Sequence, residues 1–322
     1  MAEGGSLFSD VLARITETGR ALIGAEEPRP LVERAETVMA DDGEATGTAR
    51  ARAFLDAYAA LPLPERMATL RAVATRFGPD RTRLDTAMKA YSADACDATA
   101  RALHIAAEPR SQELMRRLNR APGGTAALVA MREDLLREVK GDAALSGLDA
   151  DFRHLFASWF NRGFLELRRI DWDTPASILE KIIEYEAVHE IQDWTDLRGR
   201  VAAPDRQLYA FFHPALAGEP LIFVEVALCP EMPGAIAPIL AGDRAPTDPA
   251  KARVATFYSI SNCQKGLAGV SFGNFLIKQV VEELQRDHPA LTTFVTLSPV
   301  PAFGAWLAAD PARADIWEGD TL

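Results

Sequence analysis

Hydrophobic residues recur at spacings of three and four through most of the first 160 positions. One stripe contains Phe54, Tyr58 and Leu61 and ends at the turn Pro62-Leu63-Pro64. Further stripes contain Met67, Leu70, Val73 and Ala74; Leu114 and Leu118; and Leu128, Met131, Leu135 and Val139. Because one face of an α-helix repeats every 3.6 residues, this spacing predicts helices almost throughout residues 6–160.

Proline and glycine separate these predicted helices from one another. The breaks fall at Gly78-Pro79, Pro109, residues 121–124 and Gly141-Asp142. Between them Ala, Leu, Arg and Glu dominate, as helix propensity favours. No repeat of fixed period is evident, which argues against a solenoid. We therefore predict an all-α helical bundle over residues 1–160, packed on itself or on another subunit, with a structural or assembly role rather than a catalytic one.

The pattern changes after residue 160. Residues 163–170 alternate between apolar and polar side chains, as a half-buried strand does. The remaining predicted elements are helices after Pro175 and over 194–201, strands over 207–213, 220–228 and 253–260, a helix over about 271–285, a strand over 291–297 and a short helix near 303–307. The chain is thus predicted to be α+β, with a mixed α/β region over residues 161–322 after the helical one.

This order of elements is similar to the first part of the GNAT acyltransferase fold. The similarity is one of topology, which does not by itself give a function. The GNAT fold continues with further strands, and none is evident between residues 299 and 322. We therefore expect the second domain to be incomplete at its C-terminus.

Composition narrows the classes of protein that the chain can belong to. Its 322 residues are 48% hydrophobic and 25% charged, which is ordinary for a globular protein of about two domains. The net charge is −11 and no basic block is present, which argues against a nucleic-acid partner. The second half is the more acidic, so an anionic ligand there would depend on local groups.

Cysteine usage and hydropathy indicate where the protein resides. Cys96, Cys229 and Cys263 lie far apart and form no CxxC pair, which favours a reducing compartment and argues against a thiolate metal site. The first residues lack the features of a signal peptide, and no apolar run approaches the roughly 20 residues that span a bilayer. We expect a cytoplasmic protein without a membrane partner.

A glycine-rich segment over residues 264–274 is the first candidate site. Gly266, Gly269 and Gly273 lie between a predicted strand and the long helix. Backbone N–H groups at such a junction favour an anion, so a pyrophosphate or a developing thioester oxyanion would suit it. The segment is neither a dinucleotide fingerprint nor a P-loop, and Leu267 departs from the acyltransferase pattern Gln/Arg-x-x-Gly-x-Gly/Ala. The alternative is a tight turn in which the glycines serve packing.

The second candidate is Ser298, which stands with Pro299 at the end of the last predicted strand. Ligands of open α/β sheets bind beyond the carboxyl ends of strands, although Ser-Pro can equally begin a turn. His213 is interpreted as a turn residue and Cys263 as a small packing residue. No two histidines have the spacing of metal ligands, so no metal site is expected.

Many separated motifs together resemble malonyl-CoA decarboxylase. In the helical part they are Glu108-Pro109-Arg110, residues 118–123 and Leu128. In the second part they are residues 161–165, 168–172, 185–189, 212–214 and 218–221, and then the most specific group, Ser259-Ile260-Ser261, residues 264–267, residues 275–278 and Leu297-Ser298-Pro299. A match across so many motifs is not expected by chance.

The resemblance implies a fold, an activity and a site. Proteins of this family have a helical N-terminal domain that assembles homo-oligomers and a GNAT-like catalytic domain. They act as carboxy-lyases that convert malonyl-CoA to acetyl-CoA and CO2 without metal or organic cofactor, the CoA thioester being the substrate. The family's malonyl-CoA loop corresponds to Ala268, Gly269, Val270, Ser271, Phe272, Gly273 and Asn274, and its active-site serine to Ser298.

These assignments fit the chemistry of decarboxylation. Backbone amides at the helix start would stabilise the thioester enolate, and Ser298 would position the substrate carboxylate or relay a proton.

One departure from the family opens alternatives. The family pairs its serine with a histidine that would lie beyond Leu322, and no histidine follows His288 here, so the catalytic histidine is not assigned. We accordingly expect a truncated product or a fragment of a longer gene. Two other functions stay open: a noncatalytic CoA-binding or assembly protein, and GNAT-type acyl transfer to an amine, which the poor Gln/Arg-x-x-Gly-x-Gly match disfavours.

Overall fold

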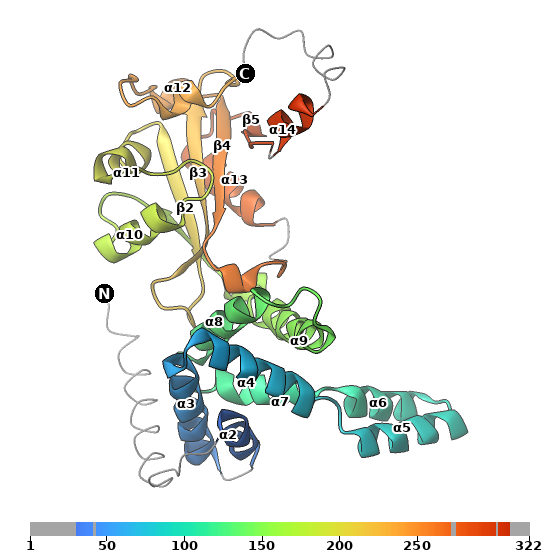
Figure 1. The fold of residues 1–322 in the computed structure, drawn as a ribbon. Helices are drawn as coiled ribbons and strands as arrows, with labels where there is room; N and C mark the ends of the chain where they lie inside the picture. The colour runs from blue at the N-terminus through green and yellow to red at the C-terminus, as the bar shows by residue number, and fades with distance from the viewer. Residues whose placement is uncertain (1–29, 41–42, 272–274, 301, 310–322) are drawn as a thin grey trace. The chain divides into compact units, whose positions relative to one another are not determined.

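The computed structural model describes residues 30–40, 43–271, 275–300 and 302–309 (Figure 1). The chain divides into two compact units, each discontinuous in sequence. Unit 1 comprises Met1–Glu166, Phe212–Glu219 and Gln264–Phe275, and unit 2 comprises Leu167–Phe211, Pro220–Cys263 and Leu276–Leu322. The domain boundaries expected from the sequence, 1–160 and 161–322, stay a prediction.

Unit 1 is built from helices. They are α2 (Leu31–Val38), α3 (Glu44–Ala60), α4 (Leu63–Arg76), α5 (Arg81–Ala93), α6 (Asp97–Ala107), α7 (Arg110–Asn119), α8 (Gly124–Leu136) and α9 (Ala143–Trp159), with the 3-10 turns η1 (Arg162–Phe164) and η3 (Lys265–Leu267). Proline and aspartate set several of the starts: Pro62 and Pro109 precede α4 and α7, and the side chains of Asp80 and Asp142 accept hydrogen bonds from the first turns of α5 and α9.

The apolar stripes form the core of unit 1. Phe54 and Tyr58 of α3, Met67 and Leu70 of α4 and Leu128 of α8 are all at most 3% exposed. α8 ends at Leu136, before Val139, so its stripe is shorter than the spacing predicted. Most helices of unit 1 therefore cover one another's apolar faces.

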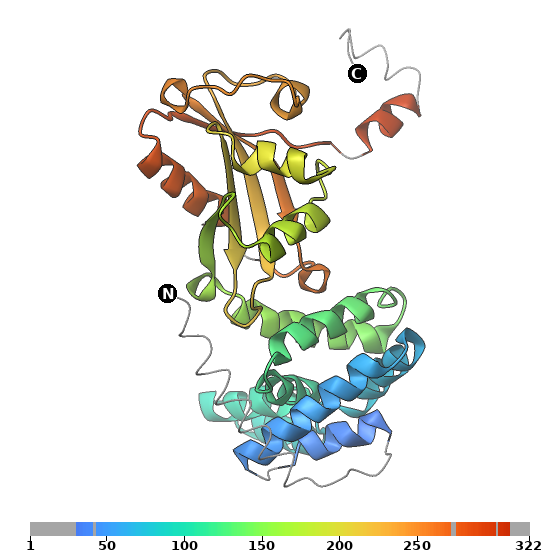
Figure 2. The same ribbon diagram turned by 90° about the vertical axis from the view of Figure 1, so that its left-hand side faces the viewer.

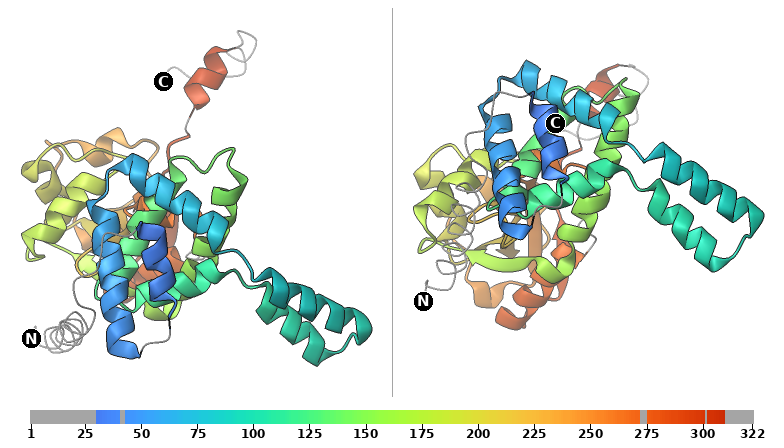
Figure 3. Two further views of the ribbon diagram at one scale, coloured as in Figure 1. Left: turned by 60° about the horizontal axis from the view of Figure 1, so that its bottom comes forward. Right: turned by 90° about the horizontal axis from the view of Figure 1, so that it is seen from below.

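The α5–α6 hairpin differs from the other helices of unit 1. Figure 3 shows these two helices side by side, extending beyond the rest of the unit. α5 has no buried residue and α6 buries only Ala106. Met88, Tyr91 and Ile105 are exposed on the hairpin. Among the described residues of unit 1, none buries these three side chains.

The turn η3 packs closely against α8 within unit 1. A Cβ atom on Gly266 would lie 2.0 Å from the carbonyl oxygen of Val129. The guanidinium of Arg132, a fully buried side chain, donates from Nη1 to the carbonyl of Gly266 (2.7 Å) and from Nε to Asp149 (2.8 Å). Close packing therefore requires glycine at position 266. This agrees, for Gly266, with the alternative interpretation of the segment as a tight turn whose glycines serve packing.

Unit 2 is a five-stranded sheet with helices on both faces. Its strands are β1 (Glu166–Ile170), β2 (Arg206–Phe212), β3 (Pro220–Cys229), β4 (Val254–Asn262) and β5 (Thr293–Thr296), in the order β1-β2-β3-β4-β5. Its helices are α10 (Ala176–Tyr185), α11 (Trp194–Val201), α12 (Ala237–Leu240), α13 (Phe275–Asp287) and α14 (Phe303–Ala308), with the 3-10 turn η2 (Pro249–Lys251). α10 and α11 cover one face of the sheet and α13 the other (Figures 1 and 2).

The two covered faces explain the apolar runs in the sequence. Every residue of β2 is buried, and so is every residue of β3 except Cys229. A strand covered on both faces shows a continuous apolar run rather than alternation. Each predicted strand and helix of this region is present, with α12 and η2 in addition, so the α+β class is confirmed. Among the helices that the structure describes, none is both long and apolar enough to cross a bilayer.

Substitution of Gly266 tests the packing of η3. We expect Gly266→Ala to lower the free energy of unfolding by roughly 3 kcal/mol, because the new methyl group meets the backbone of α8. Gly147→Ala in α9 is the matched control: no atom lies within 4 Å of its Cβ position, so a gain of up to about 1 kcal/mol is expected from helix propensity. Denaturant unfolding measures both, and equal stability of the two variants would contradict this packing.

Candidate functional site

Strand β5 ends before β4 does. β4 pairs with β5 in parallel up to Phe257 and Thr296, and the N–H of Leu297 then donates to the carbonyl of Phe257 (2.8 Å). β4 continues to Asn262, five residues past Phe257. In the described part of the chain, no strand pairs with this stretch on the side that β5 leaves. The stretch is therefore a free strand edge inside an otherwise paired sheet.

A β-bulge marks the point of separation. Glu225 of β3 faces Ser259 and Val226 faces Phe257, which leaves Tyr258 as an extra residue in β4. A bulge bends its strand and increases the local twist, and this one lies next to Phe257, the last residue of β4 that pairs with β5.

The free edge carries hydrogen-bond donors. The N–H of Cys263 donates to the carbonyl of Leu221 on β3 (2.9 Å). The backbone N–H groups of alternate residues before it on β4, Ser261 and Ser259, therefore also point toward β3. By the alternation of an antiparallel ladder, the N–H groups of Ile260 and Asn262 point the other way, toward the free edge. Two backbone donors are therefore aligned there along one line.

Ser298 follows this separation directly. It comes one residue after Leu297, the last residue of the β5 segment bonded to β4, and its side chain is exposed. It thus lies at the carboxyl end of β5, the position expected from the sequence. Its chemical role stays a prediction.

The glycine-rich segment belongs to unit 1. Ala268, Gly269 and Ser271 are exposed, whereas Val270 is buried. Gly269 has a φ of 73°, which glycine adopts without strain, and its carbonyl accepts a hydrogen bond from Nη2 of Arg153 (3.3 Å). Arg153 and the exposed Lys265 give the segment local positive charge in an acidic chain. Of the predicted binding residues, Phe272, Gly273 and Asn274 lie outside the described residues.

A buried polar cluster in unit 2 was not predicted. The carboxylate of Glu186, the residue after α10, accepts hydrogen bonds from the hydroxyls of Ser259 and Ser261 on β4. All three residues are at most 8% exposed. The signal in the sequence was two serines spaced two apart within a buried strand, because a buried hydroxyl needs a partner.

A second acid, Glu225, lies beside this cluster on β3. Its side chain is fully buried, and Arg200 of α11 approaches Oε2 at 3.2 Å. Burial raises the pKa of Glu225 to about 7, against the opposing attraction of Arg200. The hydroxyl of Tyr258 also hydrogen-bonds this carboxyl group, and burial raises the pKa of Tyr258 well above its usual value. A buried carboxyl group with a raised pKa thus lies beside Tyr258, the bulged residue.

Two cavities lie away from the predicted site residues. A cavity of about 490 Å³ in unit 2 is lined by Arg200, Arg206, Arg244 and Tyr258 among others. Its guanidinium groups already pair with carboxylates, Arg200 with Asp196 and Glu225, and Arg206 and Arg244 with Asp205. This balance of charge does not indicate an anion site.

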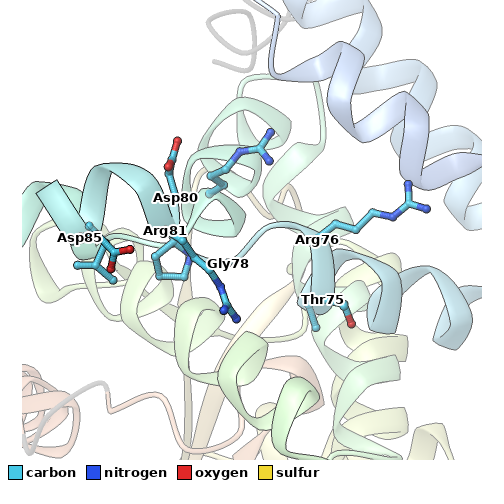
Figure 4. A pocket seen from close by; sticks show the side chains of 10 residues that line it. Thr75, Arg76, Gly78, Asp80, Arg81 and Asp85 are labelled. Atoms are coloured by element: carbon cyan, nitrogen blue, oxygen red, sulfur yellow. The ribbon is translucent and has the colours of Figure 1, made fainter.

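A cavity of about 790 Å³ in unit 1 lies where α4 gives way to α5 (Figure 4). Its lining holds Arg76, Arg81 and Arg110 with Asp80 and Asp85, and Arg110 also pairs with Glu36, so most of this charge is balanced.

His213 and Cys263, the other residues considered from the sequence, have the contacts of structural residues. Nε2 of His213 lies 3.1 Å from the carbonyl of Trp159 and Nδ1 accepts from the N–H of Ala215, as expected of a turn residue. Burial lowers the pKa of His213. Cys263 is buried, as expected of a packing residue. Over the residues that the structure covers, no three His, Cys, Asp or Glu side chains gather as metal ligands do.

Glu225 makes stability depend on pH. In the unfolded chain its pKa is near 4.5, and in the folded protein about 7. Between these values the unfolded state releases a proton that the folded state keeps, so the contribution of Glu225 lowers the free energy of unfolding as pH rises, by on the order of 3 kcal/mol at most. We expect Glu225→Gln to remove this slope in urea unfolding measured from pH 4.5 to 7.5. A slope equal to that of the parent protein would show that Glu225 is not its source.

Most of the sequence matches two domains of one known protein family. Residues 77–160 match the domain family described as "Malonyl-CoA decarboxylase N-terminal domain". Residues 163–318 match the one described as "Malonyl-CoA decarboxylase C-terminal domain". A mitochondrial malonyl-CoA decarboxylase of Anser anser anser is 40% identical over 205 residues, and the mouse protein is 39% identical over 213 residues. The matched regions are 62% and 64% of this chain but only 40% and 43% of those proteins.

Two solved bacterial structures are more similar still. Malonyl-CoA decarboxylase from Rhodopseudomonas palustris is 56% identical, with a TM-score of 0.82 over 90% of this chain and 70% of that one. The protein from Agrobacterium vitis is 52% identical, with a TM-score of 0.84 over 89% of this chain and 70% of that one. Since both domain descriptions match in order, and more than half of the aligned residues are shared with these structures, the chain belongs to the malonyl-CoA decarboxylase family.

Proposed function

We propose that this chain decarboxylates malonyl-CoA to acetyl-CoA and CO2, at the free edge of β4 beside Ser298. The relatives named malonyl-CoA decarboxylase support the reaction. The observation that carries the location is the end of pairing between β4 and the β5 segment. The last bond joins Leu297 to Phe257, and Ser298 is the next residue after Leu297. No step of this proposal uses a metal or an organic cofactor.

The free edge suits an extended substrate arm. The pantetheine part of CoA is a linear chain with two amide groups, and an extended chain can add to a strand edge through main-chain hydrogen bonds. The N–H groups of Ile260 and Asn262 would donate to such a chain. The thioester would then lie near the bulge, where pairing between β4 and β5 stops.

The chemistry needs donors for a developing negative charge. The bond between the α-carbon and the carboxylate breaks, its electron pair forms the thioester enolate, and CO2 leaves. The enolate carbon then takes a proton to give acetyl-CoA. Backbone N–H groups that hold the enolate oxygen are each worth roughly 3 kcal/mol of barrier in comparable sites. We assign to Ser298 the positioning of the carboxylate or the relay of the proton.

The glycine-rich segment is the second part of the proposal. We assign Ala268 to Asn274 to binding of the CoA ester, as the family resemblance implies. The local charge of Arg153 and Lys265 supports an anionic ligand there, because the acidic chain as a whole would repel one.

Two other functions give different outcomes in the same assays. A noncatalytic CoA-binding or assembly protein would bind CoA without releasing CO2 from malonyl-CoA. An acyltransferase would consume acetyl-CoA only when an amine acceptor is added. Acetyl-CoA formed from malonyl-CoA alone separates our proposal from both.

The cytoplasmic location expected from the sequence is likewise a proposal. The names of the goose, mouse and rat relatives place those proteins in mitochondria. Subcellular fractionation of the source cells decides between the compartments.

Replacement of Ser298 tests the catalytic assignment. We expect Ser298→Ala to lower kcat for acetyl-CoA formation by about 100-fold or more, as loss of a proton-handling or positioning group does, with no change in Tm. The matched control is Thr293→Ala, which removes another exposed hydroxyl at the start of β5. Equal turnover of Ser298→Ala and the parent enzyme would remove Ser298 from the mechanism.

We also propose that the helical domain, residues 1–160, assembles a homo-oligomer through the α5–α6 hairpin. The exposed side chains of Met88, Tyr91 and Ile105 support this assignment, because exposed apolar surface on one hairpin can mark an interface.

A charge on this hairpin tests the interface. We expect Ile105→Glu to weaken self-association by about tenfold or more, since it would bury an unpaired charge. Met232→Glu, at an exposed apolar residue of unit 2, is the control that leaves association unchanged. Analytical ultracentrifugation measures both, and identical association of the two variants would exclude the hairpin as the interface.

A further inference from the structure

The free stretch of β4 poses a structural problem of its own. A strand that lacks a neighbour on one side is held by fewer hydrogen bonds and opens more readily. Residues 258–262 have β3 on one side only, yet the proposed substrate interaction requires their backbone to stay in place. Something besides strand pairing must hold them.

The hydroxyls of Ser259 and Ser261 connect this stretch to one carboxylate. Residues two apart in a strand point to the same face, so both side chains reach the same neighbour. Ser259 Oγ lies 2.8 Å from each oxygen of Glu186, and Ser261 Oγ lies 3.0 Å from Oε2. The bonds fall only on the free stretch, beyond the bulge at Tyr258.

Glu186 is itself held by the segment that joins α10 to α11. Its Oε1 accepts hydrogen bonds from the backbone N–H groups of Val188 (2.8 Å) and His189 (2.7 Å). The N–H of Ala187 also donates to Ser261 Oγ (3.3 Å). The carboxylate therefore fastens β4 to the segment between α10 and α11.

The chemistry of this arrangement is unusual for a merely structural contact. In the described part of the chain, the donors to Glu186 are two hydroxyls and two backbone amides, with no basic side chain among them. A buried carboxylate without a cation is costly, and apolar packing generally stabilises a core better. The four donors instead fix the position of the Glu186 carboxylate and, through the two serines, the position of the strand.

We infer that Glu186 is a positioning residue, which through Ser259 and Ser261 holds residues 258–262 of β4 in line for the substrate. The inference rests on the proposed function, because it gives a purpose to a strand edge assigned there to the thioester arm. Glu186 itself touches no reacting atom in this account.

The first test needs no ligand and follows amide hydrogen exchange. The N–H groups of Ser259 and Ser261 face β3 and report local opening of the stretch. We expect Glu186→Ala to speed their exchange about tenfold or more relative to Ala255 in the paired part of β4. Thr256→Val is the matched control, because it removes a buried hydroxyl from the paired part of the same strand. Equal exchange of Ser259 and Ser261 in Glu186→Ala and the parent protein would overturn the inference.

A conservative variant separates geometry from charge. In Glu186→Gln the amide oxygen can still accept from Val188 and His189, while the amide nitrogen can donate to the serine hydroxyls. We expect this variant to restore slow exchange. Exchange as fast as in Glu186→Ala would overturn a role that rests on hydrogen-bond geometry. Should Glu186→Ala fail to fold, Ser259→Ala and Ser261→Ala remove one bond set each and are expected to give the same local effect.

The second test measures affinity for acetyl-CoA by titration calorimetry, well below the unfolding temperature. We expect Glu186→Ala to weaken binding about tenfold, and Glu186→Gln and Thr256→Val to weaken it less than about threefold. Faster exchange with unchanged affinity would show a purely structural role and overturn the inference. Absence of binding by the parent protein would instead overturn the proposed function, while the exchange comparison still decides whether Glu186 holds the strand.

Discussion

The proposed site depends on one structural constraint: pairing of β4 with the β5 segment stops after Phe257. Up to that residue the sheet is paired and covered on both faces, and beyond it β4 continues with a free edge. An unpaired edge is normally avoided because it invites other strands. Here the free edge is short, residues 258–262, and it begins at the bulge at Tyr258.

The surroundings of this opening are more polar than the core of a sheet usually is. Glu225 lies beside Tyr258, the bulged residue, and pairs with Arg200. Glu186 accepts hydrogen bonds from Ser259 and Ser261 of the free stretch. Such groups stabilise a fold only when all of their hydrogen bonds are made. Their position beside the free stretch of β4 favours a role in local geometry over one in overall stability.

The elements of the fold could be predicted from the sequence because periodicity reports burial. The apolar run over β3 and the stripe around Phe54 each identified their element correctly. Long-range contacts carried no such signal. Gly266 was interpreted as part of a ligand loop, yet its carbonyl and missing Cβ face Arg132 and Val129, more than 130 positions away in the sequence. The register shift that creates the bulge likewise depends on pairing between strands, which a single strand's sequence does not reveal.

The central claim is that the free edge of β4 receives the CoA thioester, and amide exchange tests it most directly. The N–H groups of Ile260 and Asn262 would be followed in the parent protein with and without saturating acetyl-CoA. The account predicts that exchange at these two residues slows by about tenfold or more on binding, with little change at Ala255 in the paired part of the strand. Calorimetrically confirmed binding that leaves Ile260 and Asn262 unprotected would contradict it.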